Sequence, residues 1–220
     1  MSNELKALLG IGAATILILV GGVFFLSKST STTQQNTTDT RVDKKILVRE
    51  DSYAIGSPSA KVVVVEFGDF QCPACGSAHP VVKRIVEDYK DKIYFQFRNF
   101  PLPQHQNAKL SALIAEASGS QGKFWEMHDM LYENQAEWAE SNKPMDFFEA
   151  YAKKVGLDTT KLKEDIKRDD LAKKLDRDTQ DAGAAGVNST PSFFVNGILF
   201  RGVPQYDDLQ KLIDSELQKK

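Results

Sequence analysis

The chain has 220 residues, of which 41% are apolar and 26% charged, and its formal net charge is −2. This composition is too apolar for a disordered chain, and the near-neutral charge argues against a nucleic-acid-binding domain, which is normally basic. Two cysteines are too few for a disulfide-stapled mini-protein, and the length suits one globular domain with an appendage.

The first predicted element is a membrane-spanning helix. Residues 7–26 are uncharged and almost entirely apolar, and about 20 such residues span the hydrocarbon core of a bilayer. A cleaved signal peptide is the alternative, but its apolar region is usually shorter and ends at an Ala-x-Ala-like site, which does not occur here. We therefore predict a signal-anchor over residues 1–28, a polar linker over residues 29–43 and a folded domain over residues 44–220.

A strand, a helix and a second strand are predicted next. Residues 61–67 (KVVVVEF) are mostly β-branched and apolar, which is typical of a strand buried on both faces. A helical spacing of apolar residues begins at Cys72 and runs to about Tyr89, and residues 93–97 alternate like a strand. This order predicts a βαβ unit with two parallel strands.

The middle of the chain is predicted to be helical, and its end returns to β structure. Four helices are expected over residues 106–118, 123–134, 145–155 and from 160 onward. Residues 192–195 and 198–200 flank Asn196-Gly197, a strong hairpin signal, and an amphipathic helix follows. The predicted fold class is therefore α/β, a βαβ half and a ββα half interrupted by an all-helical insertion at about residues 105–183, with one transmembrane helix before them.

The two cysteines lie together in Cys72-Pro73-Ala74-Cys75, where the first helix begins. A C-x-x-C near a βαβ pattern is typical of a redox dithiol. The unpaired N–H groups and the positive end of the helix dipole stabilise a thiolate at this position, and Pro73 suits the first helical turn. We expect Cys72 to be the exposed nucleophile and Cys75 the buried thiol that resolves the mixed disulfide.

Two structural roles are alternatives for these cysteines. Zinc could be bound by Cys72, Cys75 and His79 with His105 or His128 as the fourth ligand, but nothing in the sequence places either histidine there. A structural disulfide between such close neighbours would close a very short loop and contribute little stability. We favour the redox pair and predict no metal site.

Three segments together resemble the DsbA-like branch of the thioredoxin superfamily. They are residues 64–75 (VVEFGDFQCPAC), 124–129 (FWEMHD) and 186–197 (GVNSTPSFFVNG). The resemblance implies a thioredoxin fold and a cis peptide bond between Thr190 and Pro191, which would face the cysteine pair and bind the substrate backbone. The alternative at this position is an ordinary trans proline at the start of a strand.

Glu66 is an acid within the otherwise apolar first strand. Burial would raise the pKa of its carboxyl and allow it to exchange a proton with the thiols. The resemblance implies that it serves Cys75. The alternative is a solvated carboxylate at the edge of the strand.

Pro73 and Ala74, between the cysteines, are expected to tune the redox potential. Strong oxidants of the DsbA-like branch carry Cys-Pro-His-Cys, and here Ala74 replaces the histidine that helps to hold the thiolate. We therefore expect a less depressed pKa for Cys72 and a less oxidising disulfide, although still a net oxidant.

These features predict a membrane-anchored thiol–disulfide oxidoreductase, with its N-terminus in the cytoplasm, that introduces disulfides into secreted or surface proteins. No organic cofactor is expected, because the redox equivalents reside in Cys72 and Cys75. The resemblance implies a quinone-linked membrane partner of the DsbB or vitamin-K-epoxide-reductase type, and we expect a monomer. A reductase or isomerase and a membrane-anchored peptide-binding chaperone are the alternatives.

Two polar features are predicted to lie at the surface. The charges of residues 161–178 alternate in sign, as on a solvated helix face. His128 does not fit a zinc-protease motif, so we expect it at a helix surface or at the edge of the core.

Overall fold

A computed structural model of the chain describes residues 41–219. The predicted membrane helix and most of the predicted linker lie outside the described residues, so these two predictions stay untested. In the part of the chain that the structure describes, no helix is both long and apolar enough to cross a membrane.

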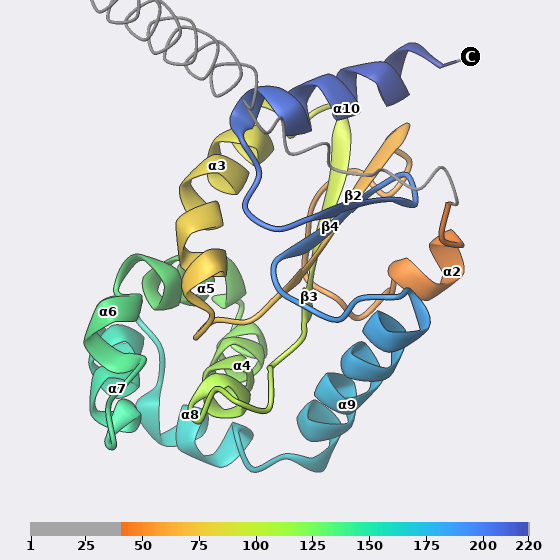
Figure 1. The fold of residues 1–220 in the computed structure, drawn as a ribbon. Coiled ribbons are helices and arrows are strands. Elements are labelled where there is room, and N and C mark those ends of the chain that lie inside the picture. The colour runs from red at the N-terminus through yellow and green to blue at the C-terminus, as the bar shows by residue number, and fades with distance from the viewer. Residues whose placement is uncertain (1–40, 220) are drawn as a thin grey trace, which may run out of the picture. The chain divides into compact units, whose positions relative to one another are not determined.

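The described residues are built around a five-stranded mixed sheet (Figure 1). The strands are β1 (Ala54–Gly56), β2 (Val62–Gly68), β3 (Ile93–Asn99), β4 (Ser192–Val195) and β5 (Ile198–Arg201), and they lie in the order β1-β3-β2-β4-β5. β2 and β3 are parallel and the other pairs are antiparallel. All seven residues of β2 are buried, which agrees with its continuous apolar sequence at the centre of the sheet.

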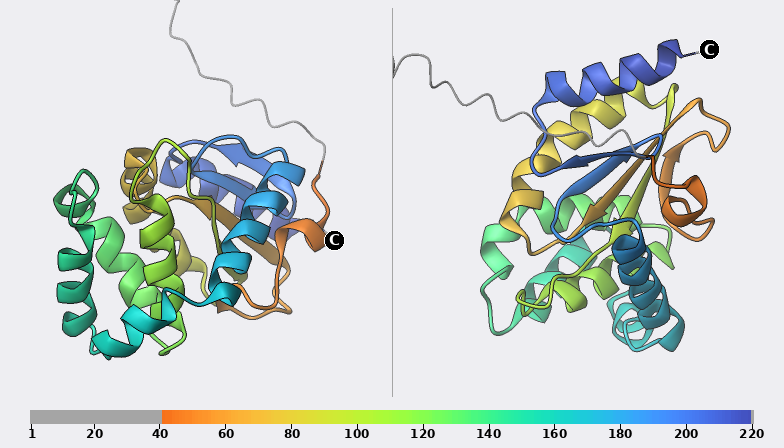
Figure 2. Two further views of the ribbon diagram at one scale, coloured as in Figure 1. Left: turned by 90° about the horizontal axis from the view of Figure 1, so that it is seen from below. Right: turned by 45° about the vertical axis from the view of Figure 1, so that its right-hand side comes forward.

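Helices cover both faces of the sheet. α3 (Pro73–Tyr89) connects β2 to β3 and lies beside α10 (Tyr206–Gln218), where Tyr89 Oη donates a hydrogen bond of 2.8 Å to Asp214 (Figures 1 and 2). The short helix α2 (Lys44–Leu47) and the end of α9 (Asp169–Ala184) pack on the opposite face. The predicted βαβ and ββα halves are confirmed, whereas α2 and β1 were not predicted.

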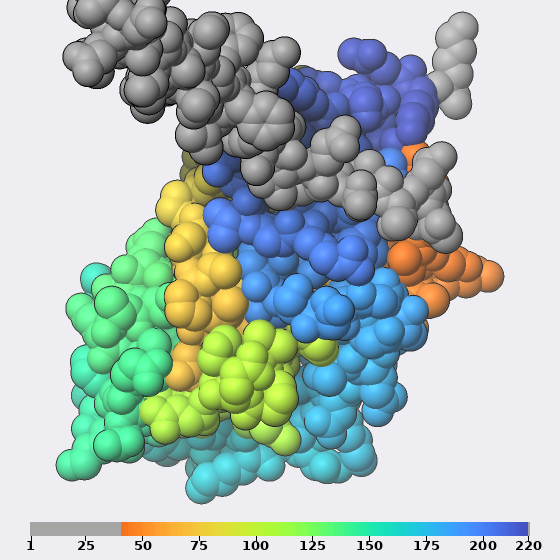
Figure 3. All heavy atoms as spheres, in the orientation of Figure 1, coloured from red at the N-terminus to blue at the C-terminus, as the bar shows by residue number. Residues whose placement is uncertain are grey.

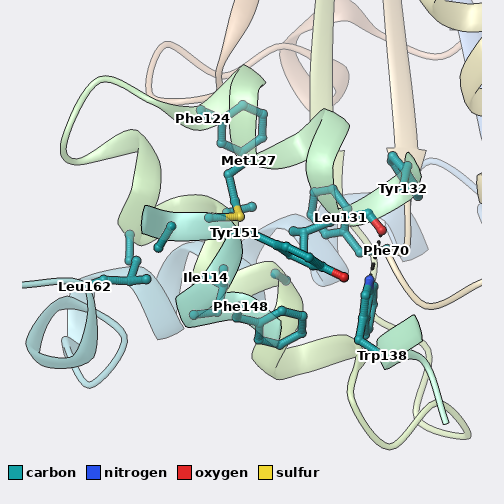
Figure 4. Close-up of a cluster of buried hydrophobic side chains, with 14 of the residues drawn as sticks. Phe70, Ile114, Phe124, Met127, Leu131, Tyr132, Trp138, Phe148, Tyr151 and Leu162 are labelled. Atoms are coloured by element: carbon teal, nitrogen blue, oxygen red, sulfur yellow. Dashed lines mark hydrogen bonds between the residues drawn. The ribbon is translucent and has the colours of Figure 1, made fainter. Parts of the chain in front are cut away.

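The insertion consists of six helices where four were predicted. They are α4 (Ala108–Gly119), α5 (Phe124–Glu133), α6 (Gln135–Trp138), α7 (Pro144–Lys154), α8 (Thr159–Asp165) and α9. The predicted helix from residue 160 is divided, because Arg168 is extended (ψ 131°) and the acidic Asp169 and Asp170 favour the start of a new helix. Figure 4 shows the aromatic core of the insertion, in which Trp138 Nε1 donates to the Leu131 carbonyl over 2.9 Å.

The prediction of a solvated face over residues 161–178 is wrong for one side of α9. Lys174 and Asp178 are buried, and they meet charges from other elements. Lys174 Nζ lies 2.6 Å from Glu116 Oε2, and the fully buried Arg98 of β3 lies 2.7 Å from Asp178 Oδ1. Buried charges are found in proteins when each has an oppositely charged partner. The Lys174–Glu116 pair joins α9 to α4 within the insertion, and the Arg98–Asp178 pair joins the insertion to the sheet.

Candidate active site

Cys72 lies where the chain leaves β2 and enters α3. It is the N-cap residue of α3 with an extended backbone (φ −66°, ψ 120°), and Pro73 occupies the first turn. Cys72 was expected to be exposed, but only 7% of the residue is accessible, so it is more buried than predicted. Cys75 is fully buried, as predicted. Both cysteines are free thiols in this structure.

The two thiols differ strongly in acidity. A hydrogen bond from the Cys75 thiol is the main reason that the pKa of Cys72 falls to about 5, and Thr190 and the backbone of Ala74 and Cys75 lower it further against the effect of burial. Burial and the neighbouring Cys72 raise the pKa of Cys75 well above its usual value. Cys72 is therefore a thiolate at neutral pH, and Cys75 is a protonated thiol.

Thr190 and Pro191 face the cysteine pair. The peptide bond between them is cis, which confirms the prediction made from the family resemblance. Cys72 Sγ lies 3.5 Å from the Thr190 carbonyl oxygen. The start of α3 (yellow), the segment after β3 (yellow-green) and the segment before β4 (blue) are neighbours on one face of the molecule (Figure 3).

Glu66 is buried in the middle of the sheet, with 3% of the residue accessible. It pairs with Phe97 of β3 on one side and Phe193 of β4 on the other, so the alternative of a solvated carboxylate at a strand edge is wrong. Burial raises the pKa of Glu66 to about 8, and its charge acts on the Cys75 thiol. The predicted acid and the predicted resolving thiol therefore interact.

Asp69 is a residue of the site that the sequence analysis missed. Its carboxylate accepts hydrogen bonds from the backbone N–H of Gln71 (2.8 Å) and Leu102 (2.9 Å), and Oδ2 lies 2.6 Å from His105 Nδ1. Its own backbone N–H donates to Cys75 Sγ over 3.5 Å. Asp69 thus joins the loop before Cys72 to the loop after β3. The sequence did offer a signal for Asp69, because an acidic residue directly after a buried strand is a candidate site residue.

Gln135 is a second such residue, and it begins the unpredicted helix α6. Its Nε2 donates to the carbonyl oxygens of Phe70 (2.7 Å) and Cys72 (2.9 Å). A Cβ atom at Gly76 would lie 2.6 Å from Gln135 Oε1, so any side chain at this position would force the Gln135 amide to move. The insertion therefore fixes the backbone of the redox motif.

The histidines do not join the cysteines. His105 pairs with Asp69, while His79 and His128 are buried against each other with ring centroids 5.3 Å apart. Of the two positions predicted for His128, the helix surface is thus wrong, whereas the edge of the core agrees with its place beside a small cavity. Among residues 41–219, the group of side chains that could bind a metal ion contains neither cysteine, so the zinc alternative at Cys72 and Cys75 has no geometric support.

Comparisons with known proteins agree with this geometry. A family model described as thioredoxin matches residues 49–215. The chain is 31% identical to a probable disulfide bond formation protein D of Bacillus cereus over 227 residues, which cover 99% of both chains. It is 36% identical over 176 residues to the Na⁺/H⁺ antiporter NhaA 1 of Salinispora arenicola, covering 79% of this chain. The chain spans only about a quarter of the length of that antiporter.

Solved structures show the same fold. A thioredoxin-like oxidoreductase from Silicibacter pomeroyi is 26% identical, with a TM-score of 0.70 over 81% of this chain and 100% of its own. Oxidised BdbD from Bacillus subtilis is 24% identical, with a TM-score of 0.70 over 83% of this chain and 99% of its own. At this level of identity, the second match supports the fold alone.

Proposed function

The chain belongs to the thioredoxin family, in which it is a DsbA-like thiol–disulfide oxidoreductase, and from this we propose that Cys72 and Cys75 introduce disulfides into secreted or surface proteins. The opposite pKa shifts of the two thiols carry this proposal. Interactions that stabilise the Cys72 thiolate also stabilise the reduced enzyme relative to the disulfide form. The disulfide is then a stronger oxidant.

The reaction begins with the Cys72–Cys75 disulfide. A substrate thiolate attacks Cys72 Sγ, a mixed disulfide forms, and Cys75 leaves with the electron pair of the broken S–S bond. A second substrate thiolate then attacks the substrate sulfur of the mixed disulfide and expels Cys72. Two electrons pass to the enzyme, and the substrate gains one disulfide. Cys72 is a good leaving group because its pKa is low. In the reverse reaction, Cys75 resolves the mixed disulfide.

Glu66 manages the proton of Cys75 in this scheme. A Cys75 thiolate is unfavourable in its buried position, so a proton must arrive as the sulfur departs. Glu66 holds a proton at neutral pH because its pKa is about 8, and it lies near enough to influence the Cys75 thiol. The carboxyl therefore acts as a general acid when Cys75 leaves and as a base when Cys75 attacks.

Thr190 and Pro191 hold the substrate backbone beside Cys72. The proximity of the Thr190 carbonyl to Cys72 Sγ supports this role, since an extended peptide that bonds to this segment brings its cysteine to the reactive sulfur. Pro73 is exposed and Ala74 is half-buried, so both border the approach to Cys72 and influence its potential.

The electrons leave through another protein, because the chain has no third cysteine to relay them. The resemblance to the DsbA-like branch supports a quinone-linked membrane partner of the DsbB or vitamin-K-epoxide-reductase type. We place the folded domain outside the cytoplasm, anchored by residues 1–28. Protease treatment of intact cells tests this placement: the domain should be digested, and its protection would contradict the proposal.

Oxidative refolding tests the proposed direction. The oxidised full-length chain in detergent is mixed with a reduced substrate that contains several cysteines, and native disulfides should form rapidly. Cys72→Ser should abolish this activity. Cys75→Ser, given a substrate that already contains disulfides, should accumulate a mixed disulfide, because the Cys72 thiolate attacks a substrate disulfide and no Cys75 thiol resolves the product. If the protein reduces the disulfides of an oxidised substrate but forms none in a reduced substrate, this result would favour a reductase. Peptide binding that persists in Cys72→Ser without either reaction would favour a chaperone.

A further inference from the structure

Two buried histidines and one aspartate form a cluster apart from the cysteine pair. His79 comes from α3, and His128 and Asp129 come from α5. The two histidines are 6% and 4% accessible, and the Nε2 atom of each is buried with no hydrogen-bond partner among residues 41–219. Buried polar atoms usually have a partner, so the unpaired Nε2 of His79, which faces Asp129, requires an explanation.

The ligand atoms are spaced as in a metal site. His79 Nε2 lies 3.6 Å from Asp129 Oδ1, and His128 Nδ1 lies 3.2 Å from the same oxygen, with which it shares a hydrogen bond that a metal ion would replace. One ligand atom from each of the three residues can be chosen so that all lie within 4.8 Å of one another. Tetrahedral zinc with bonds of about 2.0–2.1 Å requires ligand–ligand separations of roughly 3.3–3.4 Å. Only small side-chain shifts would therefore be needed.

We propose that His79, His128 and Asp129 bind a divalent transition-metal ion of the zinc class. Two imidazole nitrogens and one carboxylate oxygen form a donor set that suits zinc and its neighbours in the first transition row. Metal ions bind the neutral form of imidazole, and both rings lie buried within the fold.

Lys83 shows that the acidic side of this cluster already accommodates a cation. Its Nζ lies 2.7 Å from Asp129 Oδ2 and 2.9 Å from Glu133 Oε1. The Lys83 side chain is 41% accessible, so it can turn into solvent when a metal ion arrives. Glu133 Oε1 lies 4.0 Å from His79 Nε2, and its release by Lys83 would make it available as a fourth ligand.

A small cavity gives access to the cluster. It has a volume of about 160 Å³ and is lined by His79, His128 and Asp129 together with Trp125 and Val82. An ion at this place would connect α3, which carries the cysteines, to α5 of the helical insertion. Metal binding would therefore strengthen the contact between these two parts of the fold.

The test is a Co²⁺ and Zn²⁺ titration of the full-length chain in detergent, with Cys72 and Cys75 both changed to serine so that no thiolate can bind metal. We expect one equivalent of Co²⁺ with the visible d–d absorption of a low-symmetry N/O site and no sulfur-to-cobalt charge-transfer band. Zn²⁺ should displace the Co²⁺ and raise the thermal unfolding midpoint. A chain that binds no Co²⁺ at millimolar concentration, or binds only when the cysteines are present, would overturn the proposal.

Three variants in this background identify the ligands. Asp129→Asn should weaken binding about tenfold or more, since even supporting residues of metal sites change affinity 10–100-fold. Lys83→Gln should tighten binding roughly three- to tenfold, because it removes a competing cation. Glu126→Gln on the same helix, whose carboxylate pairs with Lys123, should leave affinity unchanged. Unchanged affinity in both Asp129→Asn and Lys83→Gln, with normal thermal unfolding, would exclude this cluster as the site.

Discussion

The Cys72 sulfur lies 3.5 Å from the Thr190 carbonyl oxygen, although 118 positions separate the two residues in the sequence. The contact joins the start of α3 to the segment before β4, and the whole helical insertion lies between them in the chain. The reactive sulfur therefore lies beside the segment that we propose to bind the substrate backbone. This arrangement underlies the predictions below.

The acidity of Cys72 should depend on Cys75. The rate of Cys72 alkylation in the reduced protein should rise with pH to a plateau with a midpoint near pH 5, as its pKa indicates. Cys75→Ala removes the hydrogen-bond donor with the largest effect and should move the midpoint to higher pH. Cys75→Ser keeps an O–H donor and serves as the matched control. A wild-type midpoint near the ordinary thiol value of about 8.5 would contradict this assignment.

Glu66 should make the protein less stable as the pH rises. Its pKa is about 8 in the folded protein and near 4.5 without the effect of burial. Between these values the unfolded chain loses the proton and the folded chain keeps it, so the free energy of unfolding falls as the pH rises through this window. Below pH 4.5 the stabilisation by the protonated form is complete, and above pH 8 no further loss occurs.

Glu66→Gln removes this proton and isolates its effect. Urea unfolding of wild type and variant at several pH values should give curves that diverge between pH 4.5 and 8, with the wild type losing stability relative to the variant. The rate of mixed-disulfide resolution by Cys75 should also lose its dependence on a group with a pKa near 8. Parallel stability curves together with an unchanged rate profile would remove Glu66 from the mechanism.

Ala74→His should make the disulfide more oxidising. An imidazolium beside the Cys72 thiolate adds an attractive charge, so the pKa of Cys72 should fall further and the reduction potential should rise by roughly tens of millivolts. Ala74→Gln introduces a side chain of comparable size without the charge and is the control. Equal potentials for the two variants would show that charge at this position does not tune the redox pair.

Arg98 should contribute far more stability than an exposed arginine. It is fully buried between Asp178 and Asp181, with Nη2 at 2.7 Å and 2.6 Å from one oxygen of each carboxylate. Arg98→Ala leaves the buried Asp178 carboxylate without its charge partner and should cost about 3–5 kcal/mol. Arg177→Ala breaks an exposed pair with Asp51 and should cost about 0–1 kcal/mol. Similar losses in chemical denaturation would contradict this account.

Four of the five strands and the redox motif could be predicted because apolar pattern and motif spacing act locally, whereas the three-residue β1 has too short a pattern. The buried run in β2 gave the central strand, and the C-x-x-C at the helix start gave the two thiols. The family resemblance, rather than the spacing, gave the cis bond at Thr190-Pro191, and the structure confirms it.

The partners of buried polar groups could not be predicted, because they come from distant segments. Lys174 and Asp178 look like solvent-facing charges until α9 packs against Glu116 and Arg98. The same is true of Gln135, whose role depends on a helix of four residues that periodicity cannot detect. The sequence shows that a side chain is polar, but tertiary packing determines which partner it contacts.

The reduction potential of the Cys72–Cys75 disulfide tests the central claim most directly. The full-length chain is equilibrated in glutathione buffers of defined ratio, and the fraction of free thiol is measured. A thiolate-stabilised Cys72 predicts a potential more oxidising than that of thioredoxin, about −270 mV. A value at or below about −270 mV would show that the pair favours reduction of its partners and would contradict the proposed oxidase.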